Sequence, residues 1–380
     1  MTNGYSIISD LSEKIFMVFY VIIVFSLILS MSTYSVIFPN LQFNINNIQR
    51  VCFSCLLLMS LFNLKKKYIF LALLIIFFGV ASFYFTKSAL FLYNIILVLS
   101  SSLCYFNRLV KIFFYTATFT TSAVIVSSLI GIIPNLIMIR EESSVLRYAL
   151  GFNHVNNLGS ILTILFFCSW YLFRKKNFTL LIINCLFIFL SQAILNSRTS
   201  LIIMFIFILI YAFINKYVLS DYLLFFYAVV LSFIVGATIY FSIHIANDKL
   251  DLLFSGRLGY LYKTHALHGF TYLGQYLGLE NQIAKESVFY VSKNHIILDN
   301  AFGRMMMEYG FISLITFSFT LYFCIKEAIK YDDTILVLIF LSIVCISFSE
   351  LYPIDFRLNL FPLFLLSRKA NNIKLLRGHL

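Results

Sequence analysis

The sequence has few charged residues and few residues that interrupt helices. Only 12% of its 380 residues are charged, and it holds 4 prolines and 14 glycines. Soluble domains carry about 25% charged residues, so this composition excludes a water-soluble fold. The 7 cysteines all lie within apolar runs, which indicates small buried side chains rather than disulfides. Cys52 and Cys55 have C-x-x-C spacing, but the sequence lacks a second pair that would complete a zinc site.

Apolar residues are abundant instead. Hydrophobic residues make up 61% of the chain, and 44 of them are Phe. A helix that spans a bilayer needs about 20 such residues in a row. Runs of roughly this kind lie at 15–37, 47–63, 68–85, 89–106, 110–133, 154–173, 178–195, 199–217, 222–245, 305–325, 333–350 and 356–367. They predict an all-α polytopic membrane protein of about 12 transmembrane helices (range about 10–13), in a single transmembrane domain over residues 1–380.

Basic residues predict the orientation of these helices. If both termini are cytoplasmic, the clusters at 65–67 and 174–176 and the basic C-terminal tail all lie inside, as the positive-inside rule requires. That side then holds 16 of the 28 Lys and Arg residues. The formal charge of +12 is spread over such clusters and forms no single basic face, so nucleic acid is not an expected partner. The apolar run after Lys14 has no small-x-small cleavage signal, which predicts a retained helix.

One connection between the apolar runs is unusually long. Most loops have about 4–6 residues, whereas this one covers residues 246–304 and is rich in Tyr, Leu and Gly with interspersed Lys, Arg and His. Such a mixture is typical of short amphipathic helices at a membrane surface. By the predicted topology, that surface is the extracytoplasmic one.

Polar residues gather at four places on the predicted outer side. The first is the loop 134–157, which contains Arg140 and Arg147 and ends in GFNHVNN with His154 and Asn157. Polar groups at a membrane entrance are unfavourable unless they are paired or face a cavity. One interpretation is helix capping and interhelical hydrogen bonding, and the other is a polar wall that binds a hydroxylated ligand.

The second place is the short turn Asn196-Ser197-Arg198-Thr199-Ser200. Ser197 or Thr199 could cap the following helix while Arg198 extends toward the interface. An Arg at a helix N-terminus opposes the helix dipole, however. An anionic partner such as a phosphate explains Arg198 better.

The third place is the long loop itself, which opens with Gly256 and Arg257. His265 and His268 follow with a spacing that puts both on one helical face. An H-x-x-H pair without further ligands is a weak sign of metal. A basic, aromatic surface that binds sugar and phosphate is the alternative, because arginine and lysine hold phosphate groups.

The fourth place lies where the long loop re-enters the membrane. His295 and Asp299 share a face if this segment is helical, and Asn300 follows directly. Asp299 could cap the next helix, where an acid favours the dipole. It could equally act as a general base on a sugar hydroxyl.

Several sequence pieces at these places resemble the Wzy-type polysaccharide polymerases of the O-antigen ligase-like superfamily. The matching pieces are GFNHVNNLG at 151–159, NSRTSL at 196–201, FSGRLGY at 254–260, LDNAFGRMMMEYGFISL at 298–314, and the ELYP turn at 350–353. Their order, the long loop and about twelve spans also fit the family. The resemblance covers residues 134–360, and the N-terminal third matches in hydropathy alone.

The resemblance implies a GT-C-like membrane glycosyltransferase in the bacterial cytoplasmic (inner) membrane. Such enzymes transfer a growing glycan from undecaprenyl pyrophosphate to a sugar hydroxyl of the next lipid-linked repeat unit, in capsule, O-antigen or exopolysaccharide synthesis. Lipid-linked oligosaccharides and the bilayer are the implied partners, together with the chain-length regulator and flippase of the same pathway. No cofactor, nucleotide sugar or metal is expected.

Site residues carry over from the matching positions. Arg257 and Arg198 match outer arginines of the family, which implies contact with the pyrophosphate leaving group, and Asp299 is the candidate base. The candidate substrate contacts are Arg140, Arg147, His154, Asn157, Gly256, His268, His295 and Asn300. Related ligases have His where this chain has Asp299, before Asn300, and this departure favours a polymerase over a ligase.

Two other activities fit the hydropathy pattern. A ligase would share the fold and use a different acceptor. A flippase for lipid-linked oligosaccharides would also have about twelve spans, but it would not need a long outer loop rich in Arg, His and Tyr. A small-solute transporter is usually marked by repeated halves or broken helices at the bilayer midplane, and neither is visible in the sequence.

Overall fold

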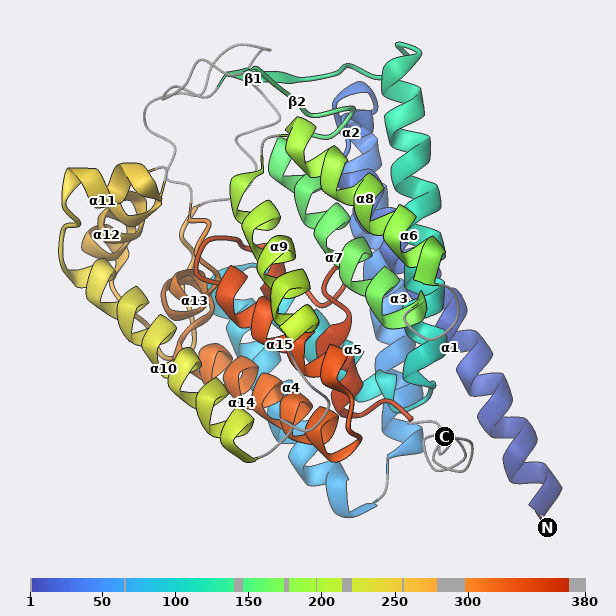
Figure 1. Cartoon of the computed structure of the whole chain (residues 1–380). Helices are drawn as coiled ribbons and strands as arrows, with labels where there is room; N and C mark the ends of the chain where they lie inside the picture. Colours follow the sequence, from blue (N-terminus) through green and yellow to red (C-terminus); the bar gives the residue numbers. More distant parts are fainter. Residues whose placement is uncertain are drawn as a thin grey trace. The chain divides into compact units, whose positions relative to one another are not determined.

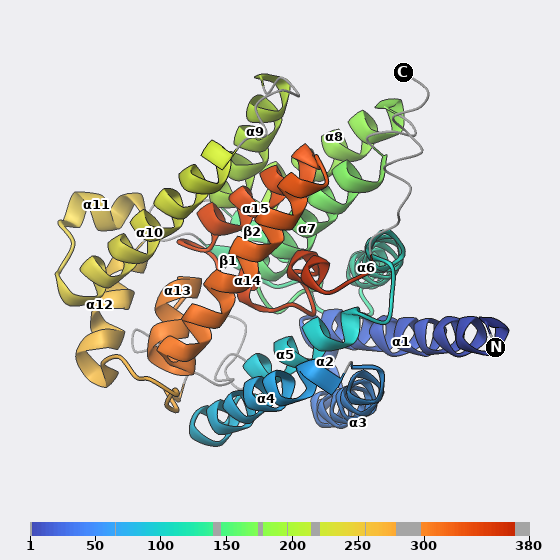
Figure 2. The ribbon, with the colours of Figure 1, turned by 90° about the horizontal axis from the view of Figure 1, so that it is seen from below.

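A computed structural model describes residues 2–64, 66–139, 146–173, 178–195, 197–213, 221–254, 256–278 and 298–368. The described residues are mostly helical, at 78%, and the only sheet among them is one short hairpin. Two compact units form, the first from residues 1–69, 96–205 and 366–380, and the second from 70–95 and 206–365. Figures 1 and 2 show the helices of each unit from two directions. Each unit is described by itself below.

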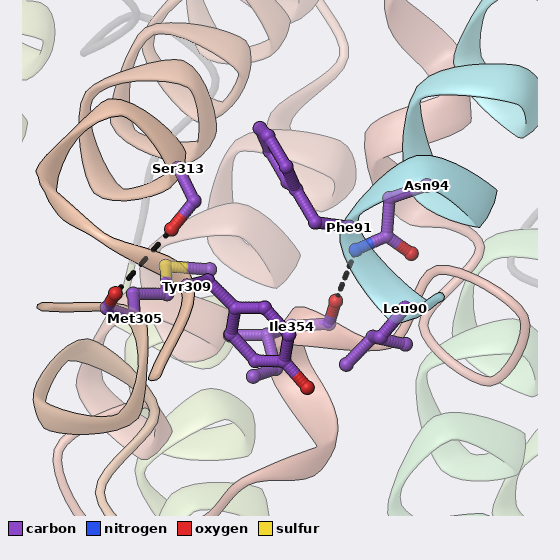
Figure 3. A pocket seen from close by; sticks show the side chains of 7 residues that line it. All are labelled: Leu90, Phe91, Asn94, Met305, Tyr309, Ser313 and Ile354. Carbon is purple, nitrogen blue, oxygen red and sulfur yellow. Dashed lines mark hydrogen bonds between the residues drawn. The ribbon is translucent and has the colours of Figure 1, made fainter. Parts of the chain in front are cut away.

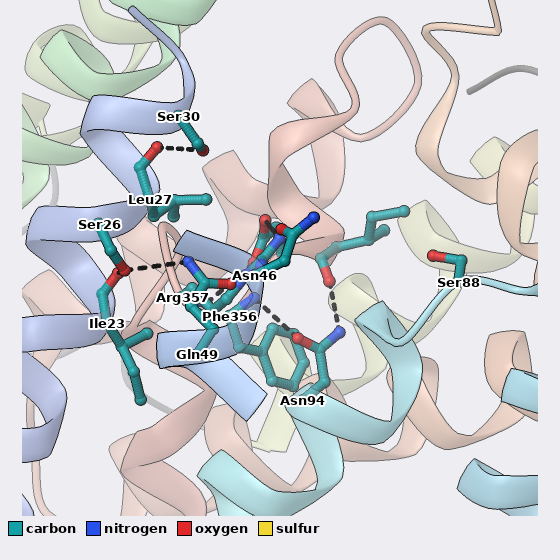
Figure 4. A network of polar contacts seen from close by, with 12 residues as sticks. Ile23, Ser26, Leu27, Ser30, Asn46, Gln49, Ser88, Asn94, Phe356 and Arg357 are labelled. Carbon is teal, nitrogen blue, oxygen red and sulfur yellow. Dashed lines mark hydrogen bonds and ion pairs between the residues drawn. The ribbon is translucent and has the colours of Figure 1, made fainter. Parts of the chain in front are cut away.

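The first unit is a helix bundle with a β-hairpin. Its elements are α1 (Thr2–Ser30), α2 (Tyr34–Ile37), α3 (Pro39–Asn63), α6 (Phe106–Leu129), β1 (Ile137–Ile139), β2 (Leu146–Tyr148), α7 (Val155–Phe173) and α8 (Phe178–Leu195). Helix α1 packs against α3 and α6, and α7 packs against α6 and α8 (Figure 1). The antiparallel hairpin pairs Ile137 with Tyr148. In Figure 4, Gln49 of α3 donates to the hydroxyl of Ser26 in α1, at 3.1 Å.

The second unit carries the long loop and the C-terminal motifs. Its elements are α10 (Asp221–Ile243), α11 (Asp248–Leu253), α12 (Arg257–His268), α13 (Ala301–Arg304), the π-helix η2 (Met305–Tyr309), α14 (Phe311–Lys330), α15 (Thr334–Ile346) and the 3-10 helices η3 (Tyr352–Ile354) and η4 (Phe361–Leu365). Helix α10 packs against α12, α13, α14 and α15. Short helices were expected in segment 246–304, and its described residues form α11 and α12. Three further helices contribute residues to both units: α4 (Lys66–Thr86), α5 (Leu90–Ser101) and α9 (Arg198–Phe213).

The helices are consistent with a bilayer environment. Among the described residues, seven helices are long and apolar enough to cross a membrane, and four shorter helices are also apolar. Only 11% of the most apolar stretch of α10 is buried within the protein, against 78% for α7. An apolar helix that stays uncovered by protein is stable in hydrocarbon rather than in water. The count of twelve spans stays a prediction.

Two predicted spans differ from the observed elements. The run 305–325 is not one continuous helix, because the π-helix η2 ends at Tyr309 and α14 begins at Phe311 after Gly310. Gly310 has φ 86° and ψ 162°, a conformation that is essentially restricted to glycine. In the run 356–367 the structure has the short 3-10 helix η4.

Candidate functional site

One guanidinium in the second unit connects three separate pieces of sequence. Nε of Arg257 lies 3.4 Å from Oδ2 of Asp299, and Nη2 lies 3.2 Å from Oε1 of Glu350. Nη1 donates to the carbonyl oxygen of Ser349. The side chain of Arg257 is 19% exposed, that of Asp299 26% and that of Glu350 7%. The three motifs FSGRLGY, LDNAFGR and ELYP therefore meet at one cluster, which we call the Arg257 cluster.

Local backbone geometry fixes Arg257 at the first position of α12. Gly256 has φ 76°, a left-handed conformation that glycine adopts without strain. The carboxylate of Asp251 accepts from the backbone N–H of Gly259 at 2.9 Å, which satisfies a free N–H in the first turn of α12. Burial disfavours the charge of Arg257, but Glu350 and Asp299 outweigh that effect and raise its pKa.

Asn300 caps α13, and Asp299 does not. The side-chain oxygen of Asn300 accepts from the N–H of Gly303 at 2.7 Å. Its amide nitrogen donates to the carbonyl oxygen of Phe348 at 2.8 Å and to the hydroxyl of Thr238 at 3.3 Å. The helix cap that was considered for Asp299 is thus provided by the neighbouring Asn300, and Asp299 instead pairs with Arg257. Because the amide of Asn300 is bound by protein groups and the residue is only 3% exposed, we assign Asn300 a positioning role.

The π-helix η2 is held by the chain that follows α12. The N–H of Thr271 donates to the carbonyl oxygen of Met306 at 3.2 Å, and the N–H of Gln275 donates to that of Glu308 at 2.8 Å. A π-helix is rare and often occurs at functional sites. Here its irregular carbonyls are satisfied by a neighbouring segment, which keeps the residues of η2 in a defined position.

A second ion pair lies beside the Arg257 cluster in sequence. Nε of Arg304 pairs with Oε2 of Glu308, and the two side chains are 21% and 6% exposed. The hydroxyl of Tyr309 lies 3.1 Å from that of Ser88. Sequence reasoning missed Arg304, although its i,i+4 spacing from Glu308 is the signal that could have identified it.

The C-terminal turn of the second unit contains a further ion pair. Arg357 donates from Nε at 2.9 Å and from Nη2 at 2.7 Å to the two carboxylate oxygens of Asp355. Its guanidinium also lies 5.7 Å from the ring centroid of Tyr93, a cation–π distance. Asn94 accepts from the N–H of Phe356 at 3.0 Å, a bond that Figure 4 shows.

A small pocket lies close to the π-helix. Figure 3 shows its lining, in which Asn94 donates to the carbonyl oxygen of Ile354, and Ser313 donates to that of Met305. The lining is mostly apolar, and there is room for little more than one water molecule. This pocket is therefore too small to hold a sugar.

The first unit holds several of the other candidate residues. Arg147 donates to the carbonyl oxygen of Leu195 at 3.1 Å and to the side chain of Asn156 at 3.2 Å. It thereby binds the last residue of α8, where a cation is favoured. Nδ1 of His154 accepts from the N–H of Asn156 at 3.1 Å. These contacts agree with the interpretation that polar residues of the loop 134–157 cap helices.

Other parts of the same motif are also structural. The carbonyl oxygen of Gly151 accepts from the N–H of Thr33 at 2.9 Å, and Asn153 donates to the hydroxyl of Ser35 at 3.2 Å. Gly151 has φ 86°, and a Cβ there would lie 2.8 Å from that of Ser128. Asn157 stays partly exposed at the start of α7.

Arg198 begins α9 with an exposed side chain. Within the described part of the chain it has no ion-pair or hydrogen-bond partner, whereas Ser197 is buried and its hydroxyl donates to that of Ser200 at 3.3 Å. His268 ends α12, and its carbonyl oxygen accepts from Gln275. Arg140 and His295 lie outside the described residues.

Among the described residues, no group of three or more His, Cys, Asp or Glu side chains is placed to hold a metal ion. Comparison of the chain with protein-family models, curated proteins and solved structures gave no match.

Proposed function

We propose that the protein is a membrane glycosyltransferase that polymerises oligosaccharide repeat units carried on undecaprenyl pyrophosphate. The observation that carries the proposal is the Arg257 cluster. Arg257, Asp299 and Glu350 come from three of the motifs that resemble Wzy-type polymerases, and they meet at one guanidinium. The proposal includes about 12 spans, a GT-C-like architecture, a location in the bacterial cytoplasmic membrane with both termini inside, and an extracytoplasmic position of segment 246–304.

In this proposal Asp299 is the general base. Its carboxylate accepts the proton of an acceptor sugar hydroxyl. The hydroxyl oxygen forms a bond to the anomeric carbon of the growing chain, while the bond from that carbon to the pyrophosphate breaks. The electron pair of the broken bond leaves with the lipid pyrophosphate. Because the lipid pyrophosphate is itself the activated leaving group, the reaction needs no nucleotide sugar.

The charges of the Arg257 cluster support this role. One guanidinium faces two carboxylates, so the cluster carries one excess negative charge. Glu350 is the more buried carboxylate and Asp299 the more exposed one. Asp299 is therefore the carboxylate that a substrate can reach, and Arg257 orients it. A cluster with excess negative charge repels a pyrophosphate, so Arg257 is poorly suited to the leaving group and another cation is required.

The residues of the first unit supply candidate substrate contacts. The exposed guanidinium of Arg198 is suited to an anionic group, because arginine binds phosphate in a bidentate way. Asn157 is suited to sugar hydroxyls, because an amide both donates and accepts. We propose Arg147 and His154 as residues that shape this region, since both hydrogen-bond to protein groups near the start of α7.

A ligase is the alternative with the same chemistry and a different acceptor. Asp299 stands at the position where ligases have His, and this difference favours polymerisation. A flippase would have little use for a partly exposed carboxylate fixed by a buried ion pair.

The test is a strain that lacks the gene. We expect single repeat units to accumulate on their lipid carrier at the outer face of the cytoplasmic membrane, and a plasmid copy to restore the polymer ladder. Accumulation at the inner face would mean a flippase, and long chains that remain on lipid would mean a ligase. Either outcome would refute the proposal.

A further inference from the structure

Three arginines of the second unit differ in how many of their donors are used. Arginine has five N–H groups. Arg357 is held in a bidentate pair by Asp355, and Arg257 is shared by two carboxylates and a carbonyl. Arg304 binds Glu308 through Nε alone. Within the described ranges of the chain, its two terminal nitrogens have no protein partner.

This difference is informative because Arg304 is largely buried. Its side chain is only 21% exposed, and buried donors without an acceptor are unfavourable. The terminal nitrogens are not among the fully buried unpartnered atoms of the described chain, so they keep some accessible surface. Burial disfavours the charge of Arg304, but Glu308, Tyr309 and Asp299 together outweigh this effect and raise its pKa, so the guanidinium stays charged.

The guanidinium is also held in place before any ligand arrives. Asn300 caps the short helix α13, at whose end Arg304 stands. The packing of α13 is close, because a Cβ on Gly303 would overlap the side chain of Leu261 in α12. Glu308 orients Nε from within the π-helix, which is itself fixed by the segment 271–275. Preorganised donors of this kind stabilise a developing charge well.

We propose that Arg304 binds the diphosphate of a prenyl-linked substrate through its two terminal nitrogens. The planar fork of a guanidinium matches two oxygens of a phosphate, and a largely buried site strengthens the contact. Glu308 is the carboxylate paired with Arg304, and Asp299 acts on Arg304 more weakly. Arg257 is paired with two carboxylates directly, so Arg304 accepts an anion more readily than the Arg257 cluster does. This inference rests on the proposed function and gives the leaving group the cation that Arg257 cannot provide.

The test measures binding of farnesyl diphosphate to the full-length protein in nanodiscs by calorimetry. Arg304→Lys keeps the charge and can still pair with Glu308, and we expect it to weaken binding about tenfold because the fork is lost. Arg257→Lys is expected to change binding less than about threefold, because that guanidinium already faces two carboxylates. Arg108→Lys is the matched control, since Arg108 pairs with Glu13 in the first unit with its side chain 61% exposed.

A second variant guards against misfolding. The double variant Arg304→Gln/Glu308→Gln replaces the ion pair by two neutral amides that can still hydrogen-bond to each other, and we expect it to melt near the wild-type temperature and to lose binding. Unchanged affinity in both Arg304 variants would overturn the inference. So would an Arg304-dependent affinity for phosphatidylglycerol nanodiscs with unchanged farnesyl diphosphate binding, because the ligand would then be a phospholipid headgroup. The binding assay contains no glycan, so it does not depend on polymerase activity. If the protein lacks polymerase activity but still binds farnesyl diphosphate in an Arg304-dependent way, the proposed function is refuted and the inference about Arg304 is not.

Discussion

Nε of Arg257 lies 3.4 Å from Oδ2 of Asp299, although the two residues stand at opposite ends of a long segment of the sequence. The same guanidinium is held from the other side by Glu350, which is 7% exposed. In the proposed reaction Arg257 therefore orients Asp299, the general base. A different residue binds the leaving group.

The first prediction concerns Arg257→Lys. Lysine keeps the charge, but a single ammonium cannot bind Asp299, Glu350 and the carbonyl of Ser349 in the fixed geometry of a guanidinium. We expect most of the polymer to be lost in a deletion strain that carries only this variant, as measured by the length distribution of the glycan on gels. Full-length polymer in that strain would show that the orientation of Asp299 by Arg257 is not required.

The second prediction separates the role of Asp299 from protein stability. In Asp299→Asn, Glu350 still neutralises Arg257, so we expect a melting temperature close to that of the wild type. Loss of a general base lowers rates about 10²–10⁴-fold, and we expect a decrease of this size in the polymerisation rate of the purified enzyme with lipid-linked repeat units. If Asp299→Asn and Asp299→Glu lose the same amount of rate, Asp299 has a structural role and is not the general base.

The third prediction concerns the buried cap at Asn300. In Asn300→Ala the N–H of Gly303 and the carbonyl of Phe348 lose their partners, and each unsatisfied buried group costs about 1–3 kcal/mol. We therefore expect a clear decrease in the melting temperature. Asn157→Ala is the matched control, because Asn157 is partly exposed. If Asn300→Ala lowers activity without lowering stability, Asn300 contacts substrate and not only the protein.

The membrane class and the polar places could be predicted from the sequence, because both depend on local composition. The apolar runs identify α1 or α7 without knowledge of any contact, and the polar places around Arg257 and Asp299 are conspicuous between such runs. The partners of these residues could not be predicted. Glu350 reaches Arg257 across a separation of 93 residues, and no local pattern specifies which of several carboxylates makes such a contact.

The residues around Asp299 illustrate a second limit. Capping was a reasonable expectation for Asp299, yet Asn300, one position later, accepts the bond from Gly303. A shift of one residue is below the precision with which a helix start can be predicted from sequence. The π-helix could not be predicted either. It lies in an apolar run that predicts one continuous helix, and hydropathy does not distinguish the hydrogen bonds of a π-helix from those of an α-helix.

The last prediction concerns Gly310, which separates the π-helix from α14. Its backbone conformation is strained for any residue with a side chain, and a Cβ there would overlap the carbonyl oxygen of Tyr272. Strain of this kind costs about 1–3 kcal/mol before any clash is counted, so we expect Gly310→Ala to lower the melting temperature of the detergent-solubilised protein and to shift the residues of η2. Gly236→Ala in α10 is the control, because nothing lies within 4 Å of its added Cβ and alanine favours a helix over glycine by about 1 kcal/mol. Gly236→Ala is thus expected to be neutral or stabilising, and equal melting temperatures for the two variants would contradict the close approach of segment 271–275 to the π-helix.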